Sequence, residues 1–191
     1  MVCLGCHQVT GGRVCVSCVA TIRPAADRLL AGGIRVVAAF EHEGAAKTLV
    51  HHLKYRGVIE VAELAAEVLA PRVPRLPLVP IPRALSRRVK YGVDPARALA
   101  AALGRRLGTP IVDGLVPPLH APRRAGRDHS RPVRPFRTRS ALRYPAIVVD
   151  DVLTTGATAV AAVDAIGAGL VQAVVSASVV SEPSNLGVQH D

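Results

Sequence analysis

Short apolar runs alternate with apolar residues at helical spacing along the chain from residue 34 onward. The short runs predict strands at residues 34–40, 76–81, 109–116, 146–149 and 170–180. The helical spacing predicts helices at residues 45–55, 61–69, 95–107 and 156–167. Strands that alternate with helices predict an α/β domain with a mainly parallel sheet flanked by helices.

Residues 117–144 break this alternation. They show little apolar periodicity and carry eight arginines, at positions 123, 124, 127, 131, 134, 137, 139 and 143. A segment of this length inside a compact domain is usually functional or disordered. We therefore expect a mobile basic flap or arm here.

The composition predicts a folded domain without a membrane span. The 191 residues are 50% hydrophobic and 20% charged, with only 3% aromatic residues, which excludes wholesale disorder. The apolar stretch at 157–180 is split by Gly167 and Gly169. A helix of that length reaches roughly 18 Å, well short of a bilayer core of ~30 Å, so we read the stretch as a buried helix followed by a buried strand. No leader precedes the first cysteines, and we expect a cytoplasmic protein.

Positive charge is concentrated in the middle of the chain. The formal net charge is +10, and residues 72–143 hold 17 basic residues against three acidic ones. Such a distribution indicates an anionic partner, either phosphates, nucleic acid or an acidic protein. Arginine supplies 21 of the 24 basic residues, a bias that Ala-, Arg- and Val-rich coding can also produce.

All four cysteines lie near the start of the chain. They form two Cys-x2-Cys pairs: Cys3, Cys6, Cys15 and Cys18. Two facing pairs can place four thiolates around one Zn²⁺ at about 2.3 Å, and Thr10-Gly11-Gly12 supplies a tight reversal between them. Disulfides, an iron–sulfur cluster and a redox pair are the alternatives, and disulfides fit a cytoplasmic protein poorly. We expect a zinc-ribbon-like head at residues 1–30, stabilised by structural zinc, and a main domain at 31–191.

The sequence around residue 150 carries the most specific chemical signal. An apolar strand leads to Asp150 and Asp151, and Thr154-Thr155-Gly156-Ala157-Thr158 follows at the start of a helix. The carboxyl ends of parallel strands are where α/β sheets bind ligands, and such a turn offers backbone N–H groups and hydroxyls to a phosphate. Carboxylates beside a phosphate site suit hydroxyl groups or a metal, so the pattern predicts a sugar phosphate with Mg²⁺. The plain alternatives are a solvated strand end and an ordinary capped helix start.

The run 148–158 resembles the phosphoribosyl pyrophosphate (PRPP) signature of type I phosphoribosyltransferases. Together with the paired cysteines, it makes the whole chain resemble the ComF family, which is named for competence and DNA uptake in bacteria. Further matches are Leu53-Lys54-Tyr55-Arg56-Gly57, the run 79–82 with the arginines after it, and Pro135-Phe136.

This resemblance implies a type I phosphoribosyltransferase-like fold and a role for each matched position. Asp150 and Asp151 would be the catalytic pair that accepts hydrogen bonds from the ribose hydroxyls of PRPP. The 5′-phosphate would be bound by Thr154, Thr155, Gly156, Ala157 and Thr158. Pyrophosphate would be held by Pro82, Arg83 and Ala84, and the segment 117–144 would close over the site. Mg²⁺ would assist the displacement of pyrophosphate. The chain departs from the family pattern at 90–95 and 123–131, which bear on the acceptor.

Two functions of different classes follow from these features. The first is a phosphoribosyltransferase with an unidentified acceptor. The intact acidic pair favours this function. The second is a non-catalytic accessory protein that works with a competence helicase and binds single-stranded DNA through the basic segment and the phosphate turn. The basic middle of the chain and its few aromatic residues favour such contacts with the DNA backbone. For Lys54 and Arg56 two interpretations stay open: they bind the ligand, or they are ordinary exposed residues at the end of a helix. His51 and His52 are expected to be surface or packing residues.

Overall fold

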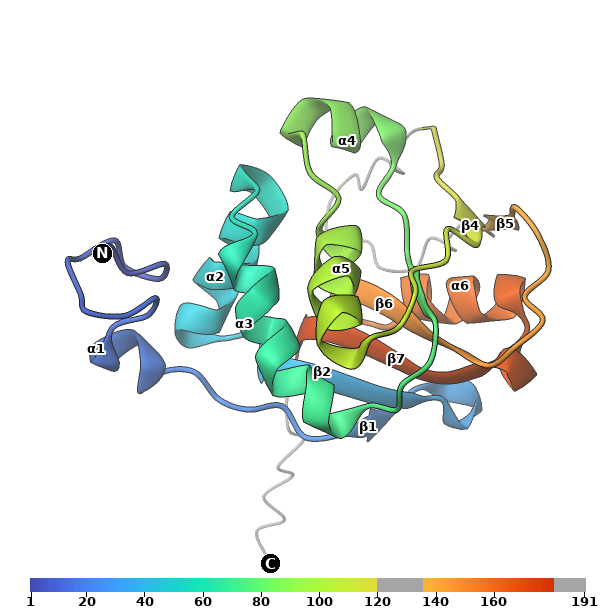
Figure 1. Ribbon diagram of the computed structural model, residues 1–191, viewed down its shortest axis with the longest axis horizontal. Coiled ribbons are helices and arrows are strands. Elements are labelled where there is room, and N and C mark those ends of the chain that lie inside the picture. Colours follow the sequence, from blue (N-terminus) through green and yellow to red (C-terminus); the bar gives the residue numbers. More distant parts are fainter. Residues whose placement is uncertain (120–135, 181–191) are drawn as a thin grey trace, which may run out of the picture.

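A five-stranded sheet forms the centre of the fold in the computed structural model, which describes residues 1–119 and 136–180 (Figure 1). In spatial order, its strands are β1 (Arg28–Leu29), β2 (Arg35–Glu41), β7 (Val171–Val179), β6 (Ala146–Leu153) and β3 (Leu78–Pro80). Strand β1 runs antiparallel to β2, and every other pairing is parallel. The predicted α/β class with a mostly parallel sheet is confirmed.

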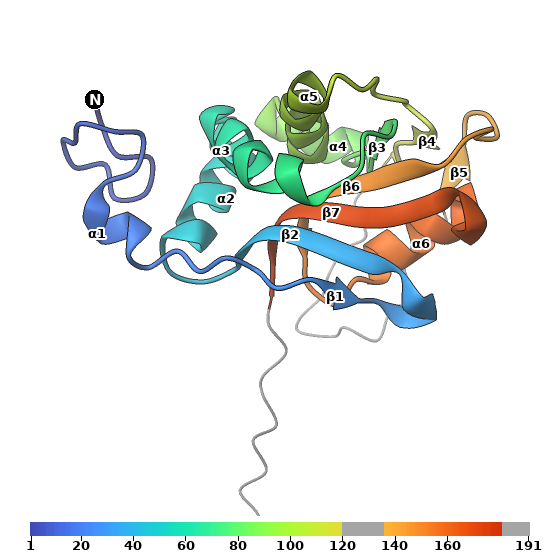
Figure 2. The same cartoon turned by 60° about the horizontal axis from the view of Figure 1, so that its bottom comes forward.

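Helices cover both faces of this sheet (Figures 1 and 2). One face packs against α2 (Gly44–Arg56), α3 (Glu60–Leu69) and α5 (Pro95–Leu107), and the other against α6 (Ala157–Ile166). Successive side chains of β6 point to opposite faces, as a strand requires. Ile147 and Val149 therefore join the first core and Val148 joins the second.

The predicted helices agree with the structure to within one residue at each end. Helix α5 shows why such segments are readable from sequence. The side chain of Asp94 caps its first turn, Pro95 occupies the first helical position, and Gly108 ends it in the left-handed conformation. The stretch at 157–180 is confirmed as helix α6 followed by strand β7. Within the described residues, we find no helix with the length and apolar character needed to span a bilayer.

The strand predicted at 109–116 is wrong for most of its length. Only β4 (Leu115–Val116) is a strand, and it pairs with β5 (Arg137–Thr138) in a separate two-stranded sheet. Asp113 is exposed and pairs with Arg97, and the N–H of Gly114 turns back to the carbonyl of Val112. Ile111 forms a single parallel bridge with Leu78 at the edge of the main sheet, and the exposed charge and the turn then stop the run from continuing as a strand.

Strand β5 lies inside the segment 117–144, for which the sequence showed no regular structure. Residues 120–135 of that segment lie outside the described part of the chain. Two short helices were also not expected: α1 (Val16–Val19) and α4 (Leu85–Tyr91). Neither carries an apolar stripe, and α4 buries none of its residues. Three 3-10 turns complete the described elements, at Ala31–Gly33, Ala70–Arg72 and Ala168–Leu170.

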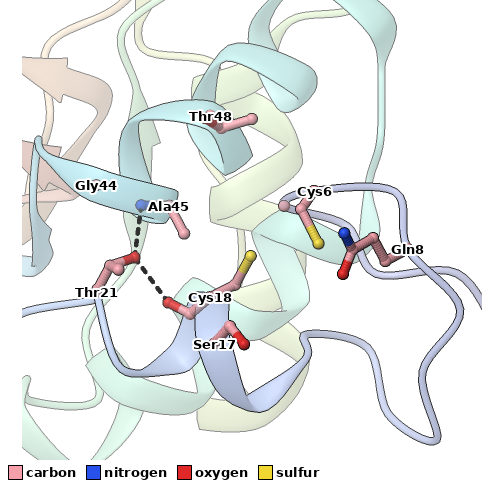
Figure 3. A pocket seen from close by; sticks show the side chains of 9 residues that line it. Cys6, Gln8, Ser17, Cys18, Thr21, Gly44, Ala45 and Thr48 are labelled. Atoms are coloured by element: carbon pink, nitrogen blue, oxygen red, sulfur yellow. Dashed lines mark hydrogen bonds between the residues drawn. The ribbon is translucent and has the colours of Figure 1, made fainter.

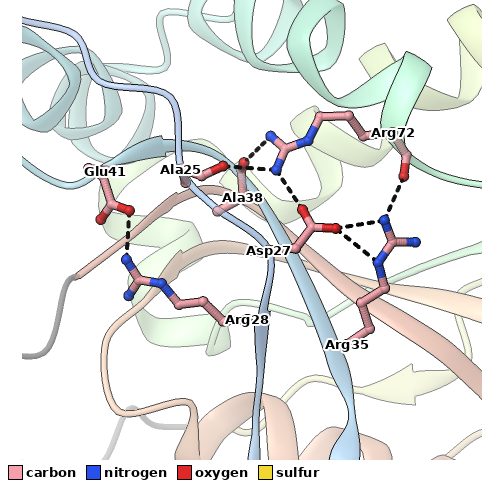
Figure 4. Close-up of polar contacts among 7 residues, drawn as sticks. All are labelled: Ala25, Asp27, Arg28, Arg35, Ala38, Glu41 and Arg72. Carbon is pink, nitrogen blue, oxygen red and sulfur yellow. Dashed lines mark hydrogen bonds and ion pairs between the residues drawn. The ribbon is translucent and has the colours of Figure 1, made fainter.

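An Arg–Asp–Arg cluster fixes the segment after the cysteines along the edge of the sheet (Figure 4). Asp27 accepts hydrogen bonds from Arg35 at 2.7 Å and from Arg72 at 2.6 Å. Arg72 also donates to the carbonyl oxygens of Ala25 and Ala38. One guanidinium therefore joins the edge segment, strand β2 and the turn after α3.

Candidate functional site

The four cysteines come together as the sequence predicts. Their sulfur atoms all lie within 4.8 Å of one another, and the Sγ atoms of Cys6 and Cys15 are 3.6 Å apart. A tetrahedral zinc site with bonds of about 2.3 Å places its sulfurs about 3.8 Å apart. The cluster is therefore compatible with structural zinc.

Backbone amides favour the thiolate form in this cluster. The N–H groups of Cys15 and Gly5 donate to Sγ of Cys3 at 3.2 and 3.4 Å. Interaction with the backbone N–H of Cys15, followed by those of Cys6 and Gly5, lowers the pKa of Cys3 to about 6. Burial acts in the opposite direction on Cys18 and raises its pKa to about 12. Because a bound cation favours thiolates, the set suits a metal better than four free thiols.

The cysteine head packs against the first turns of α2. A cavity of about 520 Å³ lies between them, lined by Cys6, Cys18 and residues of the helix start (Figure 3). The hydroxyl of Thr21 bridges the two parts: it donates to the carbonyl of Cys18 at 2.9 Å and accepts from the N–H of Ala45 at 3.0 Å. Further along the same helix, Nδ1 of His52 lies 2.9 Å from the carbonyl oxygen of Leu4. The head is thus attached to the helix whose other end reaches the acidic pair.

Asp150 and Asp151 lie toward the carboxyl end of β6, beyond the point at which the neighbouring strand β3 ends. The N–H of Ile81, just after β3, donates to the carbonyl of Val149 in β6, so β3 ends beside Val149 while β6 continues to Leu153. The chain leaves β6 toward α6 on one face and leaves β3 toward α5 on the other. Such a reversal between neighbouring strands is the usual position of ligands in open α/β sheets.

The acidic pair is buried rather than a solvated strand end. Strand β6 continues to Leu153, so both carboxylates lie within it, with 8% and 9% of Asp150 and Asp151 exposed. The N–H of Asp151 donates to Oδ1 of Asp150 at 2.8 Å. Desolvation, together with the charge of Asp151, raises the pKa of Asp150 well above its ordinary value. Burial is the largest single influence on Asp151 and acts to raise its pKa, but the charge of Lys54 and the hydrogen bonds around the carboxylate together outweigh it and lower the pKa.

Lys54 is the functional candidate that the sequence left undecided. Its Nζ lies 3.0 Å from Oδ2 of Asp151, from the last turn of α2. The contact is an ion pair without hydrogen-bond geometry, and Oδ2 has no hydrogen-bond partner among the described residues. The reading of Lys54 as a plain exposed helix end is wrong, whereas Arg56 is exposed. The pairing links residues nearly a hundred positions apart, and the only sequence signal for it was the matched Lys-Tyr-Arg-Gly run.

The turn after β6 keeps its polar groups at the surface. Thr154 and Thr155 are exposed, Ala157 and Thr158 open α6, and Gly156 has φ 73°. The left-handed conformation favours glycine, and a Cβ at position 156 would also lie 2.4 Å from Cδ2 of Leu30, whose side chain would have to shift. A second cavity of about 520 Å³ borders Thr154, Thr155 and Gly156 and is also lined by Arg28.

The turn after β3 is organised by Arg83. Its Nη1 donates to the carbonyl oxygens of Lys54 at 2.7 Å and Val93 at 3.1 Å, while Nη2 is buried and has no hydrogen-bond partner among the described residues. The guanidinium lies 4.7 Å from the ring centre of Tyr91 and 5.8 Å from that of Tyr55. Pro82 is half-buried, and Ala84 is the buried cap of α4.

The predicted site residues thus fall into two groups. The acidic pair, the turn that follows it and the turn at 82–84 share the carboxyl edge of β3 and β6, and Lys54 lies between them. The four cysteines form a separate centre on the far side of α2 (Figure 1). No protein-family model and no curated protein matches the sequence.

Proposed function

We propose that this chain is a ComF-like protein that binds PRPP at the carboxyl edge of β3 and β6. The observation that carries the proposal is the pairing of two buried carboxylates with a threonine- and glycine-rich turn at the start of α6. Carboxylates at the end of a parallel strand suit the vicinal hydroxyls of a ribose. The exposed turn and the N-terminus of α6 suit its 5′-phosphate.

The arrangement supports transfer of the phosphoribosyl group to an acceptor. Mg²⁺ would enter with the pyrophosphate of the substrate. The acidic pair would orient the ribose, and the turn of Pro82, Arg83 and Ala84 would lie beside the leaving pyrophosphate. Positive charge near that turn would stabilise the negative charge that develops as the bond to pyrophosphate breaks.

We further propose that the cysteine head holds one structural zinc ion. The four sulfur positions and the amide contacts to Cys3 support a closed tetrahedral site without an open position for chemistry. The head therefore stabilises the fold and takes no direct part in the reaction.

A second candidate function is binding of single-stranded DNA as a non-catalytic accessory protein linked to DNA uptake. Helix α4 favours it, because Arg87, Arg88 and Lys90 are all exposed on this short helix, which begins directly after the turn at 82–84. Phosphate backbones are bound by such groups without sequence preference.

The deciding experiment is calorimetric titration of Mg²⁺-PRPP into the zinc-loaded protein. We expect saturable binding that is lost when Asp150 and Asp151 are both changed to Asn, with circular dichroism unchanged. The Asp164→Asn variant is the matched control, since Asp164 is exposed on α6. Equal affinity in the double variant would refute the site.

A salt titration separates the two candidate functions. Binding of DNA that neutralises several phosphates weakens steeply with ionic strength. Binding of PRPP, which needs the hydroxyl contacts, should depend less on salt and should compete with ribose 5-phosphate. If oligonucleotides bind and PRPP does not, the accessory function replaces the transferase proposal.

A further inference from the structure

Lys54 links strand β6 to the turn that follows β3. Its Nζ lies 3.0 Å from Oδ2 of Asp151 on the β6 side. Its carbonyl oxygen accepts a hydrogen bond of 2.7 Å from Arg83, in the turn that follows β3. The backbone of Lys54 is therefore tied to the turn at 82–84, while its side chain reaches across to the acidic pair.

The Lys54–Asp151 ion pair reduces the charge repulsion in the ligand-free site. Two adjacent buried carboxylates would repel each other and any phosphate ligand. Burial favours the neutral form of Asp150, and Lys54 compensates the charge of Asp151. Lys54 and the acidic pair together therefore carry almost no net charge, and Arg83 remains as a further cation in the turn at 82–84.

The Lys54–Asp151 contact is also suited to exchange. It lacks hydrogen-bond geometry, and Oδ2 of Asp151 has no hydrogen-bond partner among the described residues. The side chain of Lys54 remains 26% exposed, against 12% for Asp151. A ligand hydroxyl could therefore offer Oδ2 a directed hydrogen bond, and the partly exposed side chain of Lys54 could then turn to another group of the ligand.

We propose that Lys54 is a ligand-binding residue that pairs with Asp151 while the site is empty and turns to the pyrophosphate oxygens when the ligand hydroxyls occupy Asp151. This inference rests on the proposed function and specifies how the same site takes its ligand. Arg83 holds the backbone of Lys54 beside the turn at 82–84, so the side chain can turn without movement of α2. A ligand that carries both hydroxyl groups and a pyrophosphate should bind better than either group alone. Its hydroxyls would replace Lys54 at Asp151, and its pyrophosphate would then bind the freed ammonium group.

The first test compares two ligands on one variant. Lys54→Met should weaken binding of Mg²⁺-PRPP about tenfold or more, because a charge-assisted contact is lost. Binding of ribose 5-phosphate, which has no pyrophosphate, should change by no more than about threefold. Lys47→Met is the matched control on the same helix, since Lys47 is exposed, and it should change neither affinity.

The second test is a double-mutant cycle with Mg²⁺-pyrophosphate as the probe. Asp151→Asn removes the charged partner of Lys54 and should strengthen pyrophosphate binding about threefold or more. The probe carries no ribose hydroxyl, so the loss of the hydroxyl contact to Asp151 does not affect it. In the Lys54→Met background, the same change should have a clearly smaller effect. If Asp151→Asn folds poorly, the two-ligand comparison still decides, because Lys54→Met leaves both carboxylates in place.

The outcomes separate this inference from the function beneath it. Equal loss of PRPP and ribose 5-phosphate in Lys54→Met would assign Lys54 a purely structural role and overturn the inference. Equal strengthening of pyrophosphate binding in both backgrounds would do the same. If the unmodified protein binds no PRPP, the proposed function and this inference both fail. If PRPP binds and Lys54→Met leaves its affinity unchanged, only the inference fails.

Discussion

The imidazole of His52 is hydrogen-bonded to the carbonyl oxygen of Leu4, with 2.9 Å between Nδ1 and the oxygen. His52 is 95% buried in the middle of α2, and its ring also lies 4.9 Å from that of His7. A third contact follows on α3, where Glu67 pairs with Arg13 of the head at 2.6 Å. The cysteine head is therefore held by specific polar contacts and is not a loosely tethered appendage.

Replacing His52 tests this attachment. We expect His52→Ala to lower the free energy of unfolding by about 1–3 kcal/mol, because it leaves the carbonyl of Leu4 without its partner and opens space under the head. His51→Ala is the matched control: His51 is the exposed neighbour on the same helix, and its loss should cost less than about 0.5 kcal/mol. Urea unfolding of both variants gives the comparison. Equal stability of the two would mean that the head contributes little to the fold.

Local sequence signals predicted the elements whose own residues decide their structure. Helix α5 has its cap, its proline and its terminal glycine within the segment, and the cysteine spacing fixes which sulfurs can meet. Helix α4 escaped prediction because it buries no side chain and so carries no apolar stripe. The run at 109–116 misled because Asp113 and Gly114 interrupt an otherwise strand-like pattern.

The sequence motif of the candidate site could be recognised, but the charged contacts between its residues could not be predicted. The run at 148–158 placed the acidic pair and the threonine- and glycine-rich turn in one neighbourhood. Nothing local shows that Asp151 pairs with Lys54 or that Arg83 donates to the carbonyl of Lys54, since both contacts join separate elements. Their formation depends on how α2 packs on the sheet, which only the tertiary structure reveals.

Loss of a cysteine ligand should release the metal and loosen the head. We expect one zinc ion per chain in the unmodified protein and almost none in Cys15→Ser. The melting temperature should fall by at least about 5 °C, since each kcal/mol lost is worth about 2–4 °C in a domain of this size. Metal analysis and calorimetry measure both effects, with Ser17→Ala as the control, because Ser17 is exposed and lies between two of the ligands. Unchanged zinc content in Cys15→Ser would contradict a four-thiolate site.

The cluster around Asp27 should stabilise the sheet edge in a pH-dependent way. Hydrogen bonds from Arg35, with a further contribution from Arg72, lower the pKa of Asp27. Its stabilisation is therefore present above the ordinary carboxyl pKa and is lost as the pH falls through the lowered value. Because Asp27 is 40% exposed, we expect Asp27→Asn to cost only about 1 kcal/mol at pH 7. The difference from the unmodified protein should vanish in strong acid.

A pair of similar charge but greater exposure is the control for Asp27. Arg23 and Glu43 lie 3.0 Å apart with side chains 78% and 54% exposed, so Glu43→Gln should change the stability by less than about 0.5 kcal/mol. Thermal unfolding at several pH values compares the two variants. If Glu43→Gln lowers the stability as much as Asp27→Asn does, the contacts of Asp27 with two arginines add no stability beyond that of an exposed ion pair.

Asp150 should oppose folding whenever it is ionised. Its burial and the neighbouring Asp151 raise its pKa in the folded state above that of the unfolded chain. Its contribution to stability is therefore fully present below the unfolded pKa and is lost as the pH rises through the folded value. Asn keeps the shape of the neutral carboxyl but cannot ionise. Asp150→Asn should therefore match the unmodified protein in acid and exceed its stability at pH 8, with each unit of pKa shift worth about 1.4 kcal/mol. Denaturant unfolding from pH 4 to 8 measures the difference. A constant difference between the two proteins across that range would show that Asp150 titrates normally and is ionised in the ligand-free protein at neutral pH.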